Sequence, residues 1–268
     1  MKKIKPFRII RAVLRRFSPP FKHKCVLCGH SSSGFLPYRG GRRHAPPLMN
    51  ALHTVGSNLD LFECPWCGCH DRERHLFLYM ESKGFLPDLS SQKVLHFAPE
   101  RHLSPKIKSA QPNEYIQCDL FPQSPDVLKV DMLQMPFDDD YFDLLIANHV
   151  LEHVGDDLKG VSEIFRVLKP GGYAILQTPF SPDLHKTWED AGINSNEARL
   201  QAYGQEDHVR LFGRDIFMRF ESSGLTSCVS EHCDLLPSID CFCFGLNERE
   251  PFFLFQKPVS INTENTLA

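Results

Sequence analysis

The first 59 residues of this 268-residue chain contain no aspartate or glutamate. They carry 12 lysines and arginines, whereas the other 209 residues carry 18 basic and 33 acidic side chains. The net charge of −3 therefore hides a part of charge +12 and a part of charge −15. This asymmetry argues against a surface that binds nucleic acid all over the protein, and it predicts an added basic element at the N-terminus.

Long apolar runs are also missing, because no stretch approaches the roughly 18 residues of a membrane-spanning helix. Arg8, Arg11, Arg15 and Arg16 interrupt the first 24 residues, which excludes a secretory signal. We therefore expect a cytoplasmic protein, in which ten cysteines are thiols or metal ligands rather than disulfides. A composition of 42% hydrophobic and 24% charged residues excludes a disordered or coiled-coil chain.

Residues 1–24 form the basic element. Apolar residues recur at near-helical intervals within it, namely Ile4, Phe7, Ile10, Leu14 and Phe17. This pattern predicts a short basic amphipathic helix over residues 2–17, which suits contact with an anionic membrane surface. A solvated arm, an arm packed on the acidic remainder of the chain, and an organellar targeting segment remain alternatives.

Two matching C-x-x-C-G turns follow, Cys25-Val26-Leu27-Cys28-Gly29 and Cys64-Pro65-Trp66-Cys67-Gly68. Two residues between cysteines let both thiolates face one ion, so we expect a structural zinc site made by Cys25, Cys28, Cys64 and Cys67. The 35 residues between the turns exceed the usual spacing, and a redox pair or core thiols are the alternatives. We interpret Cys69, His70 and His75 as neighbours of the site. Four thiolates around one Zn²⁺ ion leave a net charge of −2, which Arg39, Arg42 and Arg43 are placed to offset.

From residue 92 onward, short β-rich runs alternate with helical ones, which predicts a mostly parallel sheet of about seven strands with helices on both faces. The expected strands are 93–98, 115–119, 127–131, 142–147, 173–178 and 252–256. The expected helices are 74–83, 157–168 and 214–223. The remaining cysteines, from Cys118 to Cys243, are expected in or near strands. The domain boundaries that follow are 1–24 for the arm, 25–88 for a zinc-ribbon-like module with a connecting helix, 89–258 for the α/β domain and 259–268 for a polar tail.

Residues 130–180 contain a series of motifs in a characteristic order. These are Asp131 at a strand end, Met135-Pro136-Phe137, Tyr141-Phe142-Asp143, Leu151-Glu152-His153 and Lys169-Pro170-Gly171-Gly172. Together they resemble the class I S-adenosylmethionine-dependent methyltransferases, and the resemblance extends over residues 92–257. The cysteine module followed by Val94-Leu95-His96-Phe97-Ala98-Pro99-Glu100 is similar to a zinc-ribbon-bearing subgroup of that family. The resemblance implies a Rossmann-like fold and S-adenosylmethionine as the methyl donor.

Ligands of such sheets lie at the carboxyl ends of the strands, so strand-end side chains are the candidate cofactor site. Asp119 is placed to accept from two ribose hydroxyls, and Asp131 from an adenine amino group, with the backbone of Met132 against the ring. Asn148 and His149 flank the adenine or the methionyl end. Turn initiation or helix capping is the alternative role for each aspartate.

The loop after the first strand departs from the family, because His96 to His102 contains no glycine. Ala98 is small enough to replace one glycine, and we expect Glu100 to contact the methionyl ammonium or the ribose. The missing glycines also leave open an inactive protein, a zinc-bearing adaptor on a degenerate methyltransferase fold.

Methyl transfer requires alignment of an acceptor with the methyl group, and a hydroxyl acceptor also requires a base. His149 and His208 are the candidates for that base. A divalent ion held by His149, Glu152, His153 and His208 is the alternative, whereas an H-x-x-E-H protease is excluded by Gly155 and the preceding strand. Residues 181–210 are long for a connection and predict a lid.

The expected function is methyl transfer to a small metabolite, a sugar or a lipid-linked glycan, with the arm in peripheral contact with an anionic membrane. Methylation of RNA is the alternative enzymatic function, since contacts with RNA phosphates would use the same basic charges of the arm. Nothing in the sequence indicates the oligomeric state.

Overall fold

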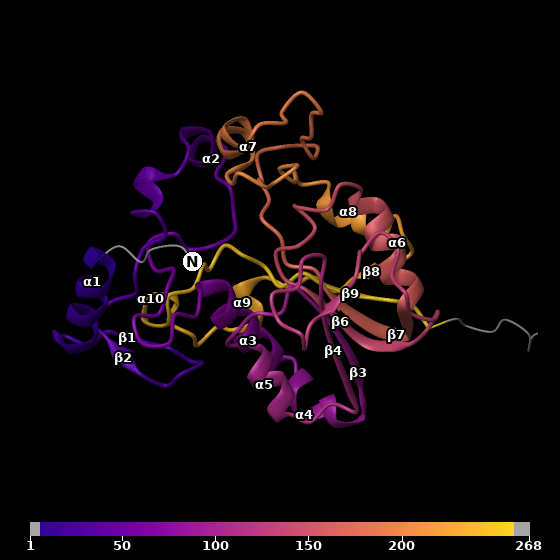
Figure 1. Cartoon of the computed structure of the whole chain (residues 1–268), viewed down its shortest axis with the longest axis horizontal. Helices are drawn as coiled ribbons and strands as arrows, with labels where there is room; N and C mark the ends of the chain where they lie inside the picture. Colours follow the sequence, from indigo (N-terminus) through magenta and orange to yellow (C-terminus); the bar gives the residue numbers. More distant parts are fainter. Residues whose placement is uncertain (1–5, 260–268) are drawn as a thin grey trace, which may run out of the picture.

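A seven-stranded sheet forms the centre of the computed structural model, which describes residues 6–259 and their side chains from residue 8 (Figure 1). The strand order is β5-β4-β3-β6-β7-β9-β8, in which β5, β4, β3, β6 and β7 are parallel and β9 runs antiparallel to both of its neighbours. The strands are β3 (Lys93–Phe97), β4 (Glu114–Asp119), β5 (Leu128–Lys129), β6 (Phe142–Ala147), β7 (Leu168–Ile175), β8 (Thr226–Ser227) and β9 (Leu254–Gln256). The predicted mostly parallel sheet is confirmed.

The two faces of the sheet bury alternate side chains, as the two-residue period of a strand requires. In β3, Leu95 belongs to one apolar cluster and Val94 to another; in β6, Leu145 and Leu144 divide in the same way. Strands buried on both faces read as continuous apolar runs, which is why residues 142–147 were readily predicted as a strand.

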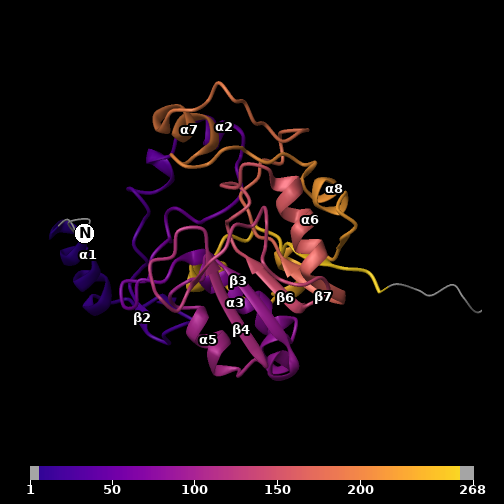
Figure 2. The ribbon, with the colours of Figure 1, turned by 45° about the vertical axis from the view of Figure 1, so that its right-hand side comes forward.

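Different helices cover the two faces (Figures 1 and 2). The first cluster contains residues of α6 (Asp157–Val167) and α8 (Ile216–Glu221). The second contains residues of α3 (Asp71–Ser82), α4 (Phe85–Asp88) and α5 (Ser104–Ser109), together with Cys25, Cys64 and Cys69. The cysteine-bearing segment therefore shares its hydrophobic core with one face of the sheet.

The remaining elements lie outside the seven-stranded sheet. The short elements of the N-terminal part are α1 (Pro6–Phe17), β1 (His23–Lys24), β2 (Ser31–Ser32), η1 (Arg42–His44), α2 (Pro47–Ala51) and η2 (Leu89–Ser91). Those of the C-terminal part are α7 (Asn196–Tyr203), α9 (His232–Leu235) and α10 (Cys241–Phe244). Far-separated segments meet here, since α2 packs against α7 and β1 against α10. None of the helices in residues 6–259 has the length and hydropathy that crossing a membrane requires.

Several boundaries differ from the sequence prediction. The connecting helix begins at Asp71 rather than Arg74, because the Glu73 carboxylate accepts a hydrogen bond from the His70 backbone and starts the helix earlier. Lys169 to Gly172 belongs to β7 instead of only ending α6. Cys233, Cys241 and Cys243 lie in α9 and α10, not in strands, since Asp240 caps α10. Ile4 of the predicted arm, and residues 260–268 of the predicted tail, lie outside the described residues, and so does the Phe7 side chain.

Candidate active site at the carboxyl edge of the sheet

Four parallel strands end side by side at one edge of the sheet. Phe97, the last residue of β3, is paired with Cys118 of β4 on one side and with Ala147 of β6 on the other. The backbone N–H of Ala98 then donates to the Cys118 carbonyl over 2.8 Å. The residues that follow these strands therefore converge, and they include the predicted site residues Ala98, Glu100, Asp119, Asp131, Met132, Asn148 and His149.

The glycine-free loop after β3 has the backbone conformation of a glycine loop. Ala98 has a φ of 46°, in the left-handed region that L-residues with a side chain seldom occupy. Alanine tolerates that conformation better than a branched residue because its side chain is one methyl group. The loop thus adopts at Ala98 a left-handed backbone conformation that usually requires glycine.

Glu100 is buried and held by hydrogen bonds within the protein. Its carboxylate accepts from the Asn148 amide over 2.5 Å and pairs with His96 Nε2 at 2.9 Å. Burial by itself would raise the pKa of Glu100, but the hydrogen bond and charge of His96 outweigh it and the pKa is lowered. Asn148 keeps its side-chain oxygen buried without a partner among the described residues. That orphaned acceptor suits an ammonium group.

Asp119 and Asp131, the two predicted cofactor ligands, also make turns, which was the alternative role expected for each. Asp119 Oδ1 accepts from the Phe121 backbone at 2.7 Å, and Asp131 Oδ1 from the Leu133 backbone at 2.9 Å. Each carboxylate has further lone pairs, and Asp119 is half-buried while Asp131 is exposed. Met132 is buried beneath them in the apolar core.

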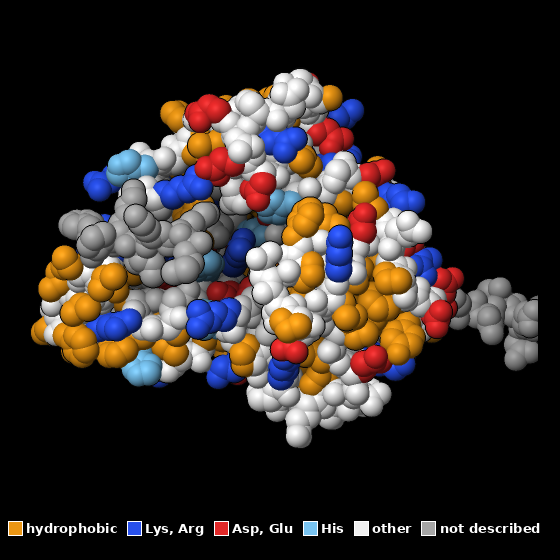
Figure 3. Space-filling model, in the orientation of Figure 1, with side chains coloured by type: hydrophobic (Ala, Val, Ile, Leu, Met, Phe, Trp, Pro, Cys, Tyr) orange, Lys and Arg blue, Asp and Glu red, His pale blue; other side chains and the backbone are white. Residues whose placement is uncertain are grey.

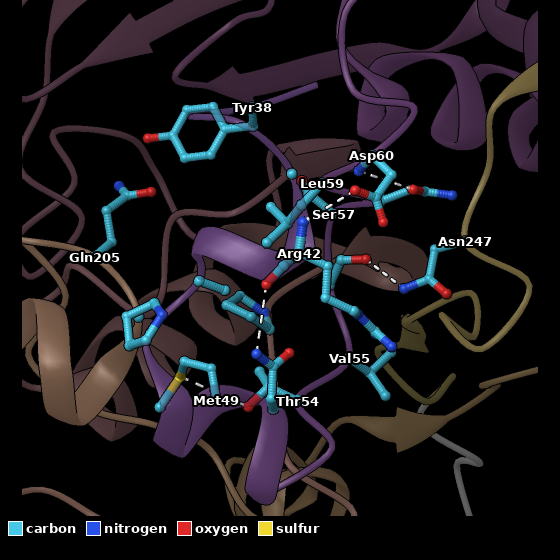
Figure 4. Close-up of a pocket in the computed structure, with 18 of the residues that line it drawn as sticks. Tyr38, Arg42, Met49, Thr54, Val55, Ser57, Leu59, Asp60, Gln205 and Asn247 are labelled. Carbon is cyan, nitrogen blue, oxygen red and sulfur yellow. Dashed lines mark hydrogen bonds between the residues drawn. The ribbon is translucent and has the colours of Figure 1, made fainter. Parts of the chain in front are cut away.

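A cavity of about 810 Å³ adjoins this edge, and Figure 3 shows the hollow with histidine, basic and acidic side chains on its walls. Segment 38–61 forms much of the lining, and Figure 4 shows how hydrogen bonds order it. The Arg42 backbone donates to Asp60 over 3.0 Å, and the Asn247 amide donates to the Gly56 carbonyl. The segment that follows β6 contributes His149 and Glu152. A cavity of this size fits a small molecule.

The predicted lid contributes the opposite wall. Leu200, Tyr203 and His208 line the cavity, and a small apolar cluster joins α7 to Met49 of α2. Trp188 packs against Tyr203 with its ring 5.4 Å away and does not line the cavity. Residues 200–208 are therefore the part of the segment that faces an acceptor.

His149 is clamped between two buried carboxylates. Its Nδ1 lies 3.3 Å from Glu152, and its Nε2 lies 3.4 Å from Glu250. Burial would lower the pKa of His149, but the two carboxylates raise the pKa to about 9. Burial alone would raise the pKa of Glu152, but the hydrogen bond and charge of His149 lower it. A protonated imidazole between two carboxylates is poorly suited to the predicted role of base.

The sequence analysis missed the partners of this clamp. Glu250 pairs with His75 at 3.2 Å, His75 meets His232 at 2.8 Å, and His232 meets the Cys241 sulfur at 3.1 Å. These residues come from α3, α9, α10 and the loop before β9, and no local motif connects them. His75 was interpreted as a neighbour of the zinc site, but it belongs to this buried network.

His208 lies on the cavity wall near the same glutamate, with its Nε2 4.0 Å from Glu152. Burial is the main reason why the pKa of His208 is lowered. The ring of His153 stands edge-on to it at 4.8 Å. The structure therefore brings together Glu152, His153 and His208, which the sequence had placed 55 residues apart.

The cysteines of the two C-x-x-C-G turns also gather, with one addition. Cys25, Cys64, Cys67 and Cys69 have sulfurs within 4.8 Å of one another, and Cys28 lies 3.9 Å from Cys64. Cys69, interpreted from the sequence as a neighbour, is thus part of the cluster. Sulfurs bound to one zinc at about 2.3 Å lie about 3.8 Å apart, which the 3.9 Å separations Cys25–Cys67 and Cys28–Cys64 match. The thiols present fit a structural zinc ion.

The positive charge nearest this cluster is not the predicted one. Arg39 pairs with Glu206, on the far side of the cavity. Arg74 is fully buried instead, and its guanidinium donates to the Cys69 carbonyl at 3.1 Å and lies 3.7 Å from the Cys69 sulfur. Arg74 is therefore the positive charge beside these sulfurs, and it would offset the negative charge of four thiolates on one zinc ion.

The order of the seven strands, with the site at the carboxyl ends of the parallel ones, is the Rossmann-like methyltransferase arrangement. Residues 92–176 match the family model described as "Methyltransferase domain". Residues 92–176 therefore form a methyltransferase domain of the class I, S-adenosylmethionine-dependent type.

Curated relatives are similar over short stretches. A probable S-adenosylmethionine-dependent methyltransferase of Mycolicibacterium smegmatis is 38% identical over 61 residues, 21% of this chain and 24% of that protein. The ubiquinone/menaquinone biosynthesis C-methyltransferase of Vibrio vulnificus is 49% identical over 43 residues, 16% of each chain. The chain thus spans about a quarter or less of the length of these relatives.

Solved structures with a similar fold include a putative methyltransferase from Bacillus halodurans, 14% identical, with a TM-score of 0.43, over 68% of this chain and 99% of that one. A putative sarcosine dimethylglycine methyltransferase from Galdieria sulphuraria is 16% identical, with a TM-score of 0.45, over 70% of this chain and 85% of that one.

Proposed function

We propose that the protein transfers a methyl group from S-adenosylmethionine to a small hydroxylated acceptor, a metabolite, a sugar or the glycan of a lipid-linked sugar. The observation that carries the proposal is the position of Asp119 at the end of β4 and of Asp131 two residues after the neighbouring β5, at the same edge of the sheet as the strained loop at Ala98. The cofactor supplies an electrophilic methyl group, whose carbon–sulfur bond breaks as the acceptor oxygen bonds to carbon and sulfur keeps the electron pair.

Residues at the carboxyl ends of the strands make the proposed contacts with the cofactor. Asp119 accepts from the ribose hydroxyls, Asp131 accepts from the adenine amino group, and the Met132 backbone faces the ring. Ala98 lets the backbone approach the cofactor closely, and Glu100 with the unpaired oxygen of Asn148 receives the methionyl ammonium. This assignment favours an enzyme over the adaptor, because an adaptor does not need an ordered loop at a strained Ala98.

The cavity supports a small acceptor over RNA. About 810 Å³ accommodates a sugar-sized molecule, and the polar lining offers several hydrogen bonds. We propose that His149 and His208, which both line it, contact and orient the acceptor oxygen, whose proton leaves to water in the cavity. Residues 200–208 hold the acceptor from the other side.

Calorimetric titration with S-adenosylmethionine and with its demethylated product tests the proposal. We expect binding below millimolar concentration, and Asp131→Ala should weaken it at least about tenfold, since a lost hydrogen bond to a charged group is worth about 1.5–3 kcal/mol. Asp131→Asn keeps the turn at Leu133 and separates the loss of charge from the loss of the turn. Asp138→Ala, at an exposed position, is the matched control. No heat at millimolar ligand would defeat the enzymatic proposal.

We also propose that α1 brings the protein to an anionic membrane surface. The helix is docked by its arginines: Arg15 donates to the Ser33 carbonyl at 3.1 Å, Arg16 to the Pro65 carbonyl at 2.8 Å, and Arg8 pairs with Glu63. Its apolar side chains point outward, and Figure 3 shows them gathered at this end of the molecule. Those that are 44–66% exposed are Ile9, Ile10, Val13, Leu14, Phe17 and nearby Phe21.

The charge around this apolar patch favours a bilayer as its occupant. Lys22 and Lys24 are exposed just beyond the helix, and no acidic residue precedes Asp60. An amphipathic helix with apolar residues outward and lysines at its border binds anionic lipid by both area and charge. A lipid-linked acceptor would be reached from that surface.

Sedimentation with vesicles measures this contact. The protein should pellet with phosphatidylcholine vesicles containing phosphatidylglycerol and much less with phosphatidylcholine alone. Ile10→Ser combined with Leu14→Ser should lower the partition coefficient at least about tenfold, because each buried side chain contributes about 1.5–3 kcal/mol. Met218→Ser, which removes an apolar side chain that is 70% exposed elsewhere, should change nothing. Pelleting without vesicles would identify a second copy of the chain as the occupant instead.

A further inference from the structure

A group of three side chains that the cofactor site does not use lies at the cavity wall, which Glu152 and His208 line. Glu152, His153 and His208 each offer one ligand atom, and these atoms lie within 4.8 Å of one another. Two imidazoles and one carboxylate are a frequent ligand set for divalent first-row transition metals. Ligand atoms about 2.1 Å from one ion lie about 3.4 Å apart in a tetrahedral arrangement, so shifts of about 1 Å bring the three into contact with an ion.

The outer hydrogen bonds of this group orient all three residues toward a common point. His208 Nδ1 donates to the Tyr203 carbonyl at 3.0 Å, which places the lone pair on the Nε2 that faces Glu152. His153 Nδ1 donates to the Asp207 carbonyl at 3.3 Å, which leaves its Nε2 as the ligand atom. Histidines that bind metals nearly always have such a partner on the other ring nitrogen.

Glu152 is fixed in the same way. Its Oε2 accepts from the Thr178 hydroxyl at 2.8 Å, and its Oε1 lies 3.3 Å from His149 Nδ1 and 4.0 Å from His208 Nε2. The carboxylate is almost fully buried, so the charge it carries requires compensation. His149 compensates part of it, but that imidazole is turned between Glu152 and Glu250 and cannot direct a free nitrogen at His208.

We propose that Glu152, His153 and His208 bind one divalent transition-metal ion on the wall of the acceptor cavity. Within residues 6–259 the group offers three ligands, so coordination positions remain open toward the cavity, where Glu152 and His208 are among the lining residues. An acceptor hydroxyl at such a position has a lowered pKa and a fixed orientation. This part of the inference rests on the proposed function, and it supplies the activation that the clamped His149 does not.

Binding of Mn²⁺ alone, followed by electron paramagnetic resonance, tests the site, because this hard ion prefers nitrogen and oxygen ligands and leaves the thiolate cluster to zinc. We expect one bound Mn²⁺ per chain in the zinc-loaded protein without cofactor or acceptor. His153→Gln and His208→Asn should each weaken binding at least about tenfold. His185→Gln, an exposed histidine that does not line the cavity, should not.

Two comparisons keep the result decisive. His153 is partly exposed, so His153→Gln is expected to fold, and retained binding of S-adenosylmethionine verifies that it does. Mn²⁺ bound equally by wild type, His153→Gln and His208→Asn, or not bound at all, overturns the site. If Mn²⁺ binds as expected but S-adenosylmethionine does not, the metal site stands and the proposed function falls; the reverse result removes the metal site alone.

Discussion

Replacing Arg74 by methionine is expected to lower the free energy of unfolding by about 3–5 kcal/mol. The guanidinium is fully buried and lies 3.9 Å from the Phe35 ring centre. It donates to five backbone carbonyls, those of Leu61, Phe62, Cys69, Phe244 and Gly245. Methionine has a similar length but no donor, so these buried carbonyls would lose their partners.

Urea unfolding followed by circular dichroism measures this loss. Arg74→Lys keeps the charge but not the planar set of donors and should cost nearly as much. The control is Arg43→Met at an exposed position, for which we expect a change within about 0.5 kcal/mol. A loss below about 1 kcal/mol for Arg74→Met would mean that water replaces the guanidinium at these carbonyls.

Arg74 also illustrates what the sequence could not show. The sequence places it at the start of the helix expected over residues 74–83, but two of its carbonyl partners lie about 170 residues away. Hydrophobic periodicity reports which face of a helix is buried, not which distant loop supplies a hydrogen bond. The same limit hid Glu250, which meets His75 and His149 only through tertiary packing.

The sheet was predictable because each strand has a local signature. Residues 142–147 are apolar except for Asp143 and their bounds were correct, whereas β5 and β8 have only two residues each and carry no periodic signal. The short helices α7, α9 and α10 were missed for a similar reason. Each has eight residues or fewer, so its stability comes from packing more than from helix propensity.

The candidate cofactor site followed from strand order, which is a property of chain topology. Asp119, Asp131 and Asn148 lie at the same edge of the sheet because β4, β5 and β6 all run parallel. The conformation of Ala98 was inferred only as a substitute for glycine, and its φ of 46° shows how the loop manages without one. The roles of His149 and His208 were less accessible, because they depend on which carboxylates surround each ring.

Removing zinc is expected to have the second large effect, and Cys64→Ser is the variant that shows it. Cys64 contacts Cys28 and belongs to the same group as Cys25 and Cys67, so every four-thiol arrangement compatible with the structure includes it. The segment between the two cysteine turns also forms the cavity wall at residues 38–61. Loss of the ion should therefore release both the module and that wall.

We expect Cys64→Ser to contain less than about 0.2 zinc per chain by mass spectrometry, against one in the wild type, and to unfold at least about 10 °C lower. The fall is large because Cys25, Cys64 and Cys69 share a core with the sheet. Cys233→Ser, at an exposed thiol, should match the wild type in both measurements. The 3.9 Å separation between the Cys28 and Cys64 sulfurs favours Cys28 as the fourth ligand. The 3.3 Å contact between Cys69 and Cys25 is too short for two sulfurs on one tetrahedral ion. We therefore expect Cys28→Ser to lose zinc and Cys69→Ser to keep it. The opposite pattern would make Cys69 the ligand, and a Cys64→Ser protein with full zinc content would contradict a four-thiolate site altogether.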